Sequence, residues 1–334
     1  MRAILKTTRT LTGSKKNSKE VKNLKVDGWD VKDSMEMAEC FNVYFSTTAD
    51  TMRDGLCQIS FDFSKLSNFV KSLKDPDVRF FVPAITRVEV NKIILAISPD
   101  KAAGIDKIAA HLLQLVPFAV APSIAKLINL SFSTGTFPSR WKTTKVRPLH
   151  KNGAECDLCN YRPISVLPVL SKVIEHHMHN TLYTFLCNNN LIFSRQSGFR
   201  KSHCTETALI KIMDALLFSL DKDRVSGVLL IDYCKAFDMV DHEVLLKKLE
   251  AYGIVNAKLK WCRSYLTGRK QVVHLDGKES SEVLMEHGVP QDSILGPLFF
   301  ILRINNLPLH VSSKVDLYAY DTTLTASAQP NDIP

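Results

Sequence analysis

The sequence predicts an α+β fold, in which amphipathic helices alternate with a few short strands. The clearest helical signal is residues 205–220, where apolar side chains recur at the spacing of one helical face. The clearest strand signals are the apolar run within residues 226–232 and the stretches 315–319 and 322–326, which predict a closing hairpin. The remaining elements follow from local signals.

The composition is that of an ordinary globular protein with a basic surface. The 334 residues are 45% hydrophobic and 23% charged, enough for one large domain or two small ones. The net charge of +9 favours a polyanionic partner such as nucleic acid, although an unspecialised basic surface is an open alternative. No apolar run approaches the ~20 residues of a membrane span, so we expect no membrane partner. Scattered cysteines and no clear targeting signal favour an intracellular protein, in the nucleus or cytoplasm.

The N-terminal part divides into a tail and an extension. Residues 1–30 carry many lysines and arginines with almost no acid, which predicts a basic flexible tail. Residues 31–85 are expected to form a helical N-terminal extension and connector. Apolar spacing predicts a helix over 34–50, whereas 54–84 are expected to be irregular because prolines interrupt them.

The compact part begins at Thr86, which is expected to form a capping box with Glu89 at the start of a helix. Periodicity and turn signals predict further elements. These are helices over 107–116 and 120–133, a strand over 143–150, a largely helical segment that starts at Pro163 and runs to 187 with a possible break at Pro168, a buried strand over 226–232, helices over 241–252 and 255–266, a strand over 271–276 that turns at Asp276 and Gly277, and a helix over 293–304.

Two of the predicted strands lead to a carboxylate, Asp232 in one case and Asp321 in the other. Buried strands that deliver carboxylates to one point suggest a divalent-metal site for phosphoryl transfer. Asp232 could instead cap a helix or stabilise a turn. Asp238 could cap a helix or pair with Lys235 or His242, so we do not assign it as a metal ligand.

Several motifs, taken in order, point to a known family. They are Asn-Tyr-Arg-Pro-Ile-Ser at 160–165, Gln-Ser-Gly-Phe-Arg at 196–200, Asp-Tyr-Cys-Lys-Ala-Phe-Asp at 232–238, Gly-Val-Pro-Gln-Asp-Ser at 288–293 and Tyr-Ala-Tyr-Asp at 318–321. From residue 86 to about residue 326 the chain resembles the reverse transcriptase domain of jockey-like retrotransposons, which lack long terminal repeats. The resemblance implies the fingers and partial palm of a right-hand polymerase over 86–334, truncated before the thumb, and hence a fragment of the element's protein.

The resemblance also implies roles for particular residues. Asp232 and Asp321 would be catalytic ligands of Mg²⁺, and Arg162 would bind the triphosphate. Phe237 would lie under the sugar and exclude a 2′-hydroxyl, although a core phenylalanine is an equally good interpretation. Gln291 would contact the sugar or base of the nucleotide. The implied activity is RNA-directed DNA synthesis, with an RNA template, a DNA primer and deoxynucleoside triphosphates as partners.

The chain departs from the family pattern at three positions. Tyr320 stands where the family has the first Asp of Tyr/Phe-x-Asp-Asp, and a neutral phenol is a poor Mg²⁺ ligand. Asp316 cannot replace that carboxylate, because four strand residues span about 13 Å. Asp292 replaces the usual Gly and would add bulk and negative charge near the phosphates. Asn306 replaces the Asp of Asn-Asp-Leu-Pro, which indicates a lost salt bridge or cap.

We therefore expect a reverse transcriptase domain whose catalysis is impaired. Lys145 and Lys151 are weaker candidates than Arg162 for the triphosphate contact. The alternative function is a non-catalytic remnant that binds nucleic acid through its basic surface.

Overall fold

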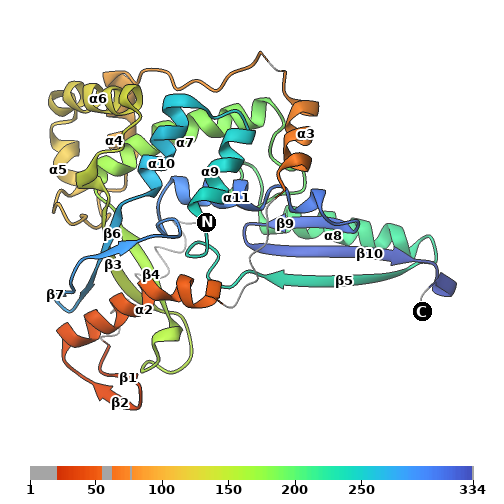
Figure 1. Ribbon diagram of the computed structural model, residues 1–334, viewed down its shortest axis with the longest axis horizontal. Coiled ribbons are helices and arrows are strands. Elements are labelled where there is room, and N and C mark those ends of the chain that lie inside the picture. Colours follow the sequence, from red (N-terminus) through yellow and green to blue (C-terminus); the bar gives the residue numbers. More distant parts are fainter. Residues whose placement is uncertain (1–20, 55–61, 76, 333–334) are drawn as a thin grey trace, which may run out of the picture.

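The elements of the chain form a mixed α/β fold (Figure 1). The computed structural model describes residues 21–54, 62–75 and 77–332. The strands are β1 (Leu24–Val26), β2 (Trp29–Val31), β3 (Thr143–His150), β4 (Tyr161–Val166), β5 (Val225–Asp232), β6 (Arg269–Leu275), β7 (Lys278–Glu279), β8 (Val283–Met285), β9 (Lys314–Tyr318) and β10 (Asp321–Ala328). The helices are α2 (Ser34–Asp54), α3 (Ser64–Leu73), α4 (Arg87–Ala96), α5 (Ala110–Leu115), α6 (Pro117–Thr134), α7 (Val169–Asn188), α8 (Thr205–Leu220), α9 (His242–Ala251), α10 (Asn256–Leu266) and α11 (Leu295–Ile304).

The described strands form three sheets. β1 pairs with β2, β5-β10-β9 form a three-stranded sheet, and β4-β3-β6-β7 form a larger sheet to which β8 adds through β6. In Figure 1, α4, α6, α7 and α10 gather above the larger sheet and α2 crosses its lower part, while the three-stranded sheet extends to the right with α8 beside it. Among the helices described, none is long and apolar enough to cross a bilayer.

The main core lies among the helices and holds α10 and α11 in place. The rings of Phe137 and Tyr265 meet edge to face with centroids 5.1 Å apart, and Tyr265 also contacts Phe299 of α11 at 5.8 Å. Trp261 is fully buried, and its indole N–H donates a hydrogen bond to the Ser131 hydroxyl at 2.9 Å. Large aromatic side chains contribute most of the apolar area in such a core.

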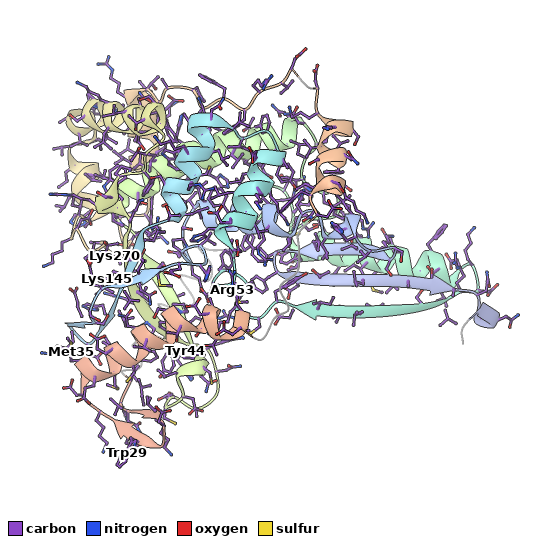
Figure 2. The ribbon with its side chains drawn as sticks, in the orientation of Figure 1. Trp29, Met35, Tyr44, Arg53, Lys145 and Lys270 are labelled. Carbon is purple, nitrogen blue, oxygen red and sulfur yellow. The ribbon has the colours of Figure 1, made fainter. Side chains whose placement is uncertain are left out.

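A second core joins α2 to the larger sheet. Met37, Phe41 and Phe45 recur every four residues along α2 and are buried against the sheet. The ring of Phe41 meets Tyr161 of β4 edge to face, with centroids 4.8 Å apart. Figure 2 shows Tyr44 and Arg53 further along α2, and Trp29 at the tip of the β1–β2 hairpin. The N-terminal extension is therefore packed onto the sheet as part of the fold.

The N-terminal expectations hold only in part. Residues 1–20 of the expected basic tail lie outside the described residues. Its described end is not a flexible tail, because β1 and β2 form a hairpin and Leu24 is fully buried. The expected irregular connector contains α3, whose Leu66 and Val70 lie one turn apart and are buried in the main core. The signal was present in the sequence, because Leu66, Phe69, Val70 and Leu73 have the spacing of one helical face, but the prolines further along the segment favoured an irregular connector.

The predicted helical segment over 163–187 is wrong at its start. Residues Tyr161–Val166 form β4, and α7 begins only at Val169. Tyr161, Arg162 and Pro163 are buried, exposed and buried, which is the alternation of a strand. Pro163, the first residue of the predicted helical segment, lies opposite Pro148 in the antiparallel pair of β3 and β4.

The expectations that rest on local signals are confirmed. Thr86 and Glu89 form the reciprocal capping box at the start of α4. β6 turns into β7 through Asp276 and Gly277, whose φ angles of 46° and 81° suit a tight hairpin turn. The closing hairpin is formed by β9 and β10, which are joined by a two-residue turn.

Asn306 leaves a buried lysine without a charge partner in the contacts described. Lys248 on α9 is 6% exposed, and its ammonium donates hydrogen bonds to the Asn306 side-chain oxygen at 2.5 Å and to the Arg303 carbonyl. Burial, reinforced by the positive charge of Arg303, lowers the pKa of Lys248 to about 7. An Asp at position 306 would place a carboxylate against this ammonium, so the interpretation of a lost salt bridge agrees with the geometry.

We predict that the Asn306→Asp variant is more stable than the wild type at pH 7. In the wild type, folding releases the Lys248 proton between pH 7 and about 10, so the free energy of unfolding rises with pH over that window. A carboxylate would raise the folded pKa, and each recovered pKa unit stabilises the protein by about 1.4 kcal/mol at pH 7. Urea unfolding at pH 7 and pH 9 measures both effects.

Asn306→Ala is the matched control, because it removes the acceptor without adding a charge and should lower stability. Equal stability of Asn306→Asp and wild type at pH 7, with the same change between pH 7 and pH 9, would contradict the account.

Candidate active site

The two carboxylates predicted from the sequence lie opposite each other. β5 and β10 are antiparallel, with Asp321 in register with Asp232. Residues opposite each other in such a pair have Cβ atoms about 4.5–5.5 Å apart. The pKa of Asp321 is raised, because its carboxylate is partly desolvated and because the Asp232 carboxylate repels its charge. A divalent cation held by the pair would relieve this repulsion.

The expectation that β5 is buried is wrong. Val228, Leu229 and Leu230 are 47%, 56% and 76% exposed. β5 is the edge strand of its sheet, so it pairs only with β10 among the described strands. Asp232 is itself exposed, so burial alone does not require that its carboxylate be paired with a cation. A continuous apolar run predicts a strand but cannot show what covers its faces.

Tyr320 lies in the turn that precedes Asp321. Its side chain is half-buried and packs against the main core. A phenol is neutral at pH 7 and adds no negative charge to the carboxylate pair. Asp316 is engaged elsewhere, because it is 6% exposed and forms an ion pair with Arg195 at 2.7 Å. Asp316 therefore does not join the pair of Asp232 and Asp321, as the strand geometry predicts.

A loop from outside the sheet holds this turn in place. The Gln196 side-chain oxygen accepts hydrogen bonds from the backbone N–H of Gly198 at 2.7 Å and of Ala319 at 3.2 Å. The Ser197 N–H donates to the Leu317 carbonyl of β9 at 2.7 Å. A Cβ atom on Gly198 would lie 1.8 Å from the Ala319 nitrogen, so only glycine fits. The motif at 196–200 thus positions the turn before Asp321.

Phe237 and Gln291 lie on two neighbouring loops. The Phe237 ring is half-buried, stacks on Phe300 with centroids 5.5 Å apart, and meets Phe199 edge to face at 6.1 Å. The Gln291 side-chain N–H₂ donates to both carboxylate oxygens of Asp238, at 3.0 and 3.1 Å.

Asp238 therefore pairs with an amide that sequence reasoning did not consider. Burial raises the pKa of Asp238. This effect outweighs the hydrogen bond from Gln291 and the positive charge of Lys235, which both lower that pKa. His242 contacts the Gly288 carbonyl at 2.7 Å instead.

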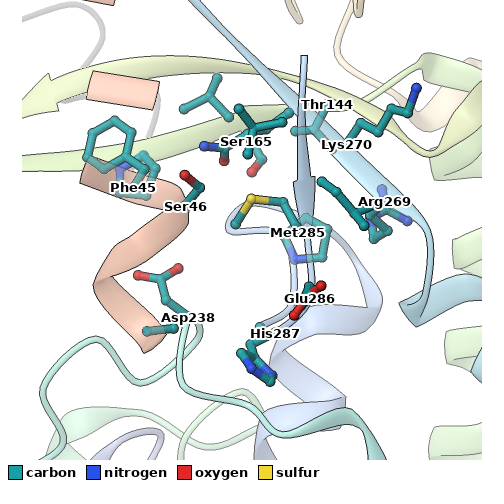
Figure 3. A pocket seen from close by; sticks show the side chains of 18 of the residues that line it. Phe45, Ser46, Thr144, Ser165, Asp238, Arg269, Lys270, Met285, Glu286 and His287 are labelled. Atoms are coloured by element: carbon teal, nitrogen blue, oxygen red, sulfur yellow. The ribbon is translucent and has the colours of Figure 1, made fainter. Parts of the chain in front are cut away.

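A cavity of about 350 Å³ opens beside Gln291 and Asp238. Figure 3 shows Phe45 and Ser46 of α2 on one side of it, and Arg269 and Met285 of β6 and β8 on the other. Asp232, Asp321, Phe237 and Arg162 are not among the residues that line this cavity. The structure therefore pairs the two carboxylates at the closing hairpin, and Gln291 lines a cavity that these carboxylates do not reach.

Arg162 belongs to a basic strand face. It is exposed on β4 and lies opposite Leu149 of β3. Side chains of alternate strand residues and of their partners point to the same face, so Arg162, Arg147 and Lys145 share one face of the β3–β4 pair. Sequence reasoning missed Arg147, although its alternation with Lys145 in a predicted strand was the available signal.

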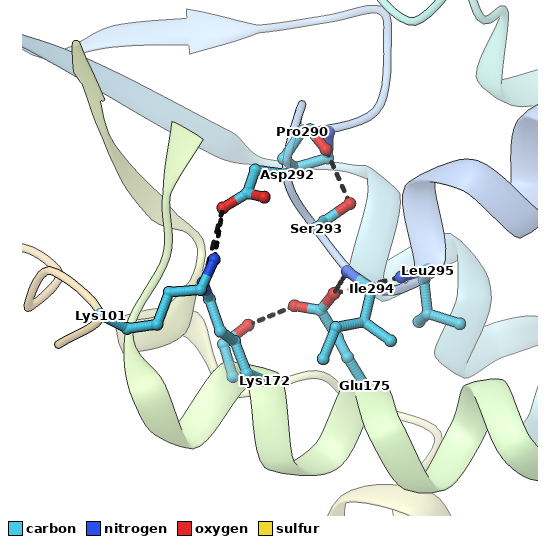
Figure 4. A network of polar contacts seen from close by, with 9 residues as sticks. Lys101, Lys172, Glu175, Pro290, Asp292, Ser293, Ile294 and Leu295 are labelled. Atoms are coloured by element: carbon cyan, nitrogen blue, oxygen red, sulfur yellow. Dashed lines mark hydrogen bonds and ion pairs between the residues drawn. The ribbon is translucent and has the colours of Figure 1, made fainter. Parts of the chain in front are cut away.

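Asp292 is better accommodated than expected. Its backbone has a φ of 70°, a conformation that favours the glycine of the family pattern. Its carboxylate lies 3.7 Å from the Lys101 ammonium and 3.8 Å from that of Lys172 (Figure 4). Just below, the fully buried Glu175 accepts a hydrogen bond from the Ile294 N–H at 2.9 Å, at the start of α11. The added negative charge at Asp292 is therefore offset by two lysines.

Comparison with known proteins agrees with this geometry. Residues 149–333 match the family model described as reverse transcriptase (RNA-dependent DNA polymerase). The chain is 30% identical over 255 residues to the RNA-directed DNA polymerase from mobile element jockey of Drosophila melanogaster, covering 74% of this chain and 28% of that protein. It is 30% identical over 249 residues to the probable RNA-directed DNA polymerase from transposon X-element of the same species, covering 71% of this chain and 27% of that protein. The RNA-directed DNA polymerase from mobile element jockey of Drosophila funebris is 31% identical over 242 residues, covering 71% of this chain and 26% of that protein.

The fold and the paired carboxylates fit the class of nucleic-acid polymerases. The family match, over more than half of the chain, makes the assignment definite: the chain belongs to the reverse transcriptase family, and its domain is of the jockey-like kind found in retrotransposons without long terminal repeats. The chain spans about a quarter of the length of these relatives.

We predict that Gly198→Ala destabilises the protein by at least about 2 kcal/mol, because the new methyl group would displace the turn at Ala319. Urea unfolding measures this loss. Gly227→Ala is the matched control, since a Cβ on Gly227 of β5 meets no atom within 4 Å. If the two variants unfold at the same urea concentration, the close contact between Gly198 and the turn does not exist.

Proposed function

We propose that this chain forms the fingers and part of the palm of a reverse transcriptase whose catalysis is impaired by Tyr320. The larger sheet with α4–α7 corresponds to the fingers, and the β5-β10-β9 sheet corresponds to the palm. The observation that carries the proposal is the register of Asp321 with Asp232, because it brings two carboxylates together at the end of the sheet. The substrates would be an RNA template, a DNA primer and deoxynucleoside triphosphates.

The donor set fits Mg²⁺ in part. Asp232 and Asp321 supply two carboxylates, and Mg²⁺ is commonly held by one or two carboxylates together with substrate phosphates. In the ranges that the structure describes, no group of three or more His, Cys, Asp or Glu could hold a metal ion. Bound by this pair, Mg²⁺ would activate the primer 3′-hydroxyl and neutralise charge on the triphosphate. Tyr320 leaves the site one carboxylate short of the family pattern.

Other residues would bind and orient the nucleotide. The basic face of Arg162, Arg147 and Lys145 would attract the triphosphate, because guanidinium groups bind phosphate oxygens in a bidentate fashion. Phe237 would limit the space beside the sugar. Asp238 engages the N–H₂ of Gln291, so the side-chain oxygen of Gln291 is the atom that would face a ligand.

We predict that the purified chain shows no more Mg²⁺-dependent primer extension on an RNA template than its Asp232→Ala variant. The physical reason is the neutral Tyr320 in place of a metal-binding carboxylate. An active reverse transcriptase in the same assay serves as the positive control. Extension by the wild type above the Asp232→Ala background would show that catalysis survives and would overturn the proposed impairment.

A second function, nucleic-acid binding without catalysis, is favoured by the basic face on β3 and β4. Each phosphate contact to a single strand contributes a slope of about −0.7 in log K against log salt. Replacing both Arg147 and Arg162 with Ala should therefore reduce the magnitude of the RNA-binding slope by about 1.4. Fluorescence anisotropy over a salt series measures it. Lys71→Ala, at an exposed position on α3, should leave the slope unchanged, and no wild-type affinity at low salt would exclude this function.

A further inference from the structure

The last turns of α2 direct polar side chains toward the two loops that carry Phe237 and Gln291. Arg53 lies in the final turn of α2, and its guanidinium contacts a residue from each loop. One nitrogen forms an ion pair with the Asp241 carboxylate at 2.8 Å, and the other lies 3.1 Å from the ring Nδ1 of His287. Figure 2 shows Arg53 at the end of α2 that lies nearest the three-stranded sheet in that view.

The two contacted residues stand at the base of the loops. Asp241 caps α9 by accepting the Val244 N–H at 2.9 Å, and it comes three residues after Asp238. His287 directly precedes the segment 288–291, which ends at Gln291. Arg53 therefore contacts both loops at positions close to the residues that would face a nucleotide.

The loops themselves are tightly joined. The Gly288 N–H donates to the Val240 carbonyl at 2.9 Å, and the Val289 N–H donates to the Phe237 carbonyl at 3.0 Å. A Cβ on Gly288 would lie 3.0 Å from the Asp238 backbone, so the loops have little room to slide past each other. A displacement at their base would thus be passed on to Phe237 and to the hydrogen bonds between Gln291 and Asp238.

Two further contacts tie α2 to the same loops. The Asp50 carboxylate lies 3.3 Å from the His287 Nε2, one helical turn before Arg53. The Lys235 ammonium lies over the Tyr44 ring, 5.1 Å from its centroid. Asp50, Asp238 and His287 all line the cavity, and Figure 3 shows Asp238 beside α2 with His287 below it. The contacts to both loops therefore come from one helix, which is itself anchored on the larger sheet by Phe41 and Phe45.

We propose that Arg53 is a positioning residue that couples α2 to the loops carrying Phe237 and Gln291, so that the N-terminal extension sets the geometry of the nucleotide site. The fork of a guanidinium can engage two partners at once, which a lysine ammonium does with much less directional preference. The coupling itself rests on the contacts of this structure. Its consequence for a nucleotide rests on the proposed function.

Hydrogen exchange tests the coupling without any ligand. In Arg53→Ala, the backbone amides of 233–241 and 286–291 should exchange at least about tenfold faster than in the wild type, whereas those of α10 should not change. Arg263→Ala is the matched control. Arg263 of α10 forms an exposed ion pair with Glu243 of α9, the helix that Asp241 caps, and Arg263 contacts neither loop. Arg53→Lys should give an intermediate rate. Asp241→Asn keeps an oxygen that can cap α9 but removes the charge, and it should reproduce the effect of Arg53→Ala without altering α2.

Binding of a fluorescent deoxyadenosine triphosphate analogue in the presence of Mg²⁺ tests the consequence. The dissociation constant should rise at least about fivefold in Arg53→Ala and partly recover in Arg53→Lys, with Arg263→Ala like the wild type. Faster exchange in Arg53→Ala together with no binding by the wild type would support the coupling and count against the proposed function. Unchanged exchange in both Arg53→Ala and Asp241→Asn would overturn the coupling, whether or not nucleotide binds.

Discussion

The antiparallel register of β5 and β10 is the constraint on which the candidate site depends. A slip by one residue would separate Asp232 from Asp321 and turn every side chain of the strand to the other face. The register is supported from outside the sheet, because the loop around Gly198 packs against the turn at Ala319. A segment without chemistry of its own therefore determines where the two carboxylates meet.

The structure accommodates each of the three departures from the family pattern. Tyr320 packs against the main core, which supports the turn between β9 and β10. Asp292 adopts a backbone conformation suited to glycine, and Lys101 and Lys172 offset its charge. The Asn306 side chain still accepts a hydrogen bond from the buried Lys248, although a neutral amide cannot neutralise the charge of that lysine. In each case neighbouring side chains preserve the structure around the altered residue.

The sequence predicts the features whose cause is local. The capping box at Thr86 and the turn at Gly277 depend on a few adjacent residues, and both are confirmed. The exposure of β5 was not predictable, because it depends on which elements cover a strand and not on its own residues. The pair of Gln291 with Asp238 joins residues 53 positions apart, and no spacing rule relates them. The carboxylate pair could be predicted because both motifs place an Asp at a strand end.

The most direct test of the central claim is a crystal structure of the Tyr320→Asp variant grown with Mn²⁺, a substitute for Mg²⁺ that anomalous scattering can locate. The account predicts one strong anomalous peak between the carboxylates of Asp232 and Asp321, with the new carboxylate at position 320 turned toward it. The wild-type crystal should show a much weaker peak at the same place. A metal bound elsewhere, or carboxylates of Asp232 and Asp321 too far apart to share one ion, would contradict the account.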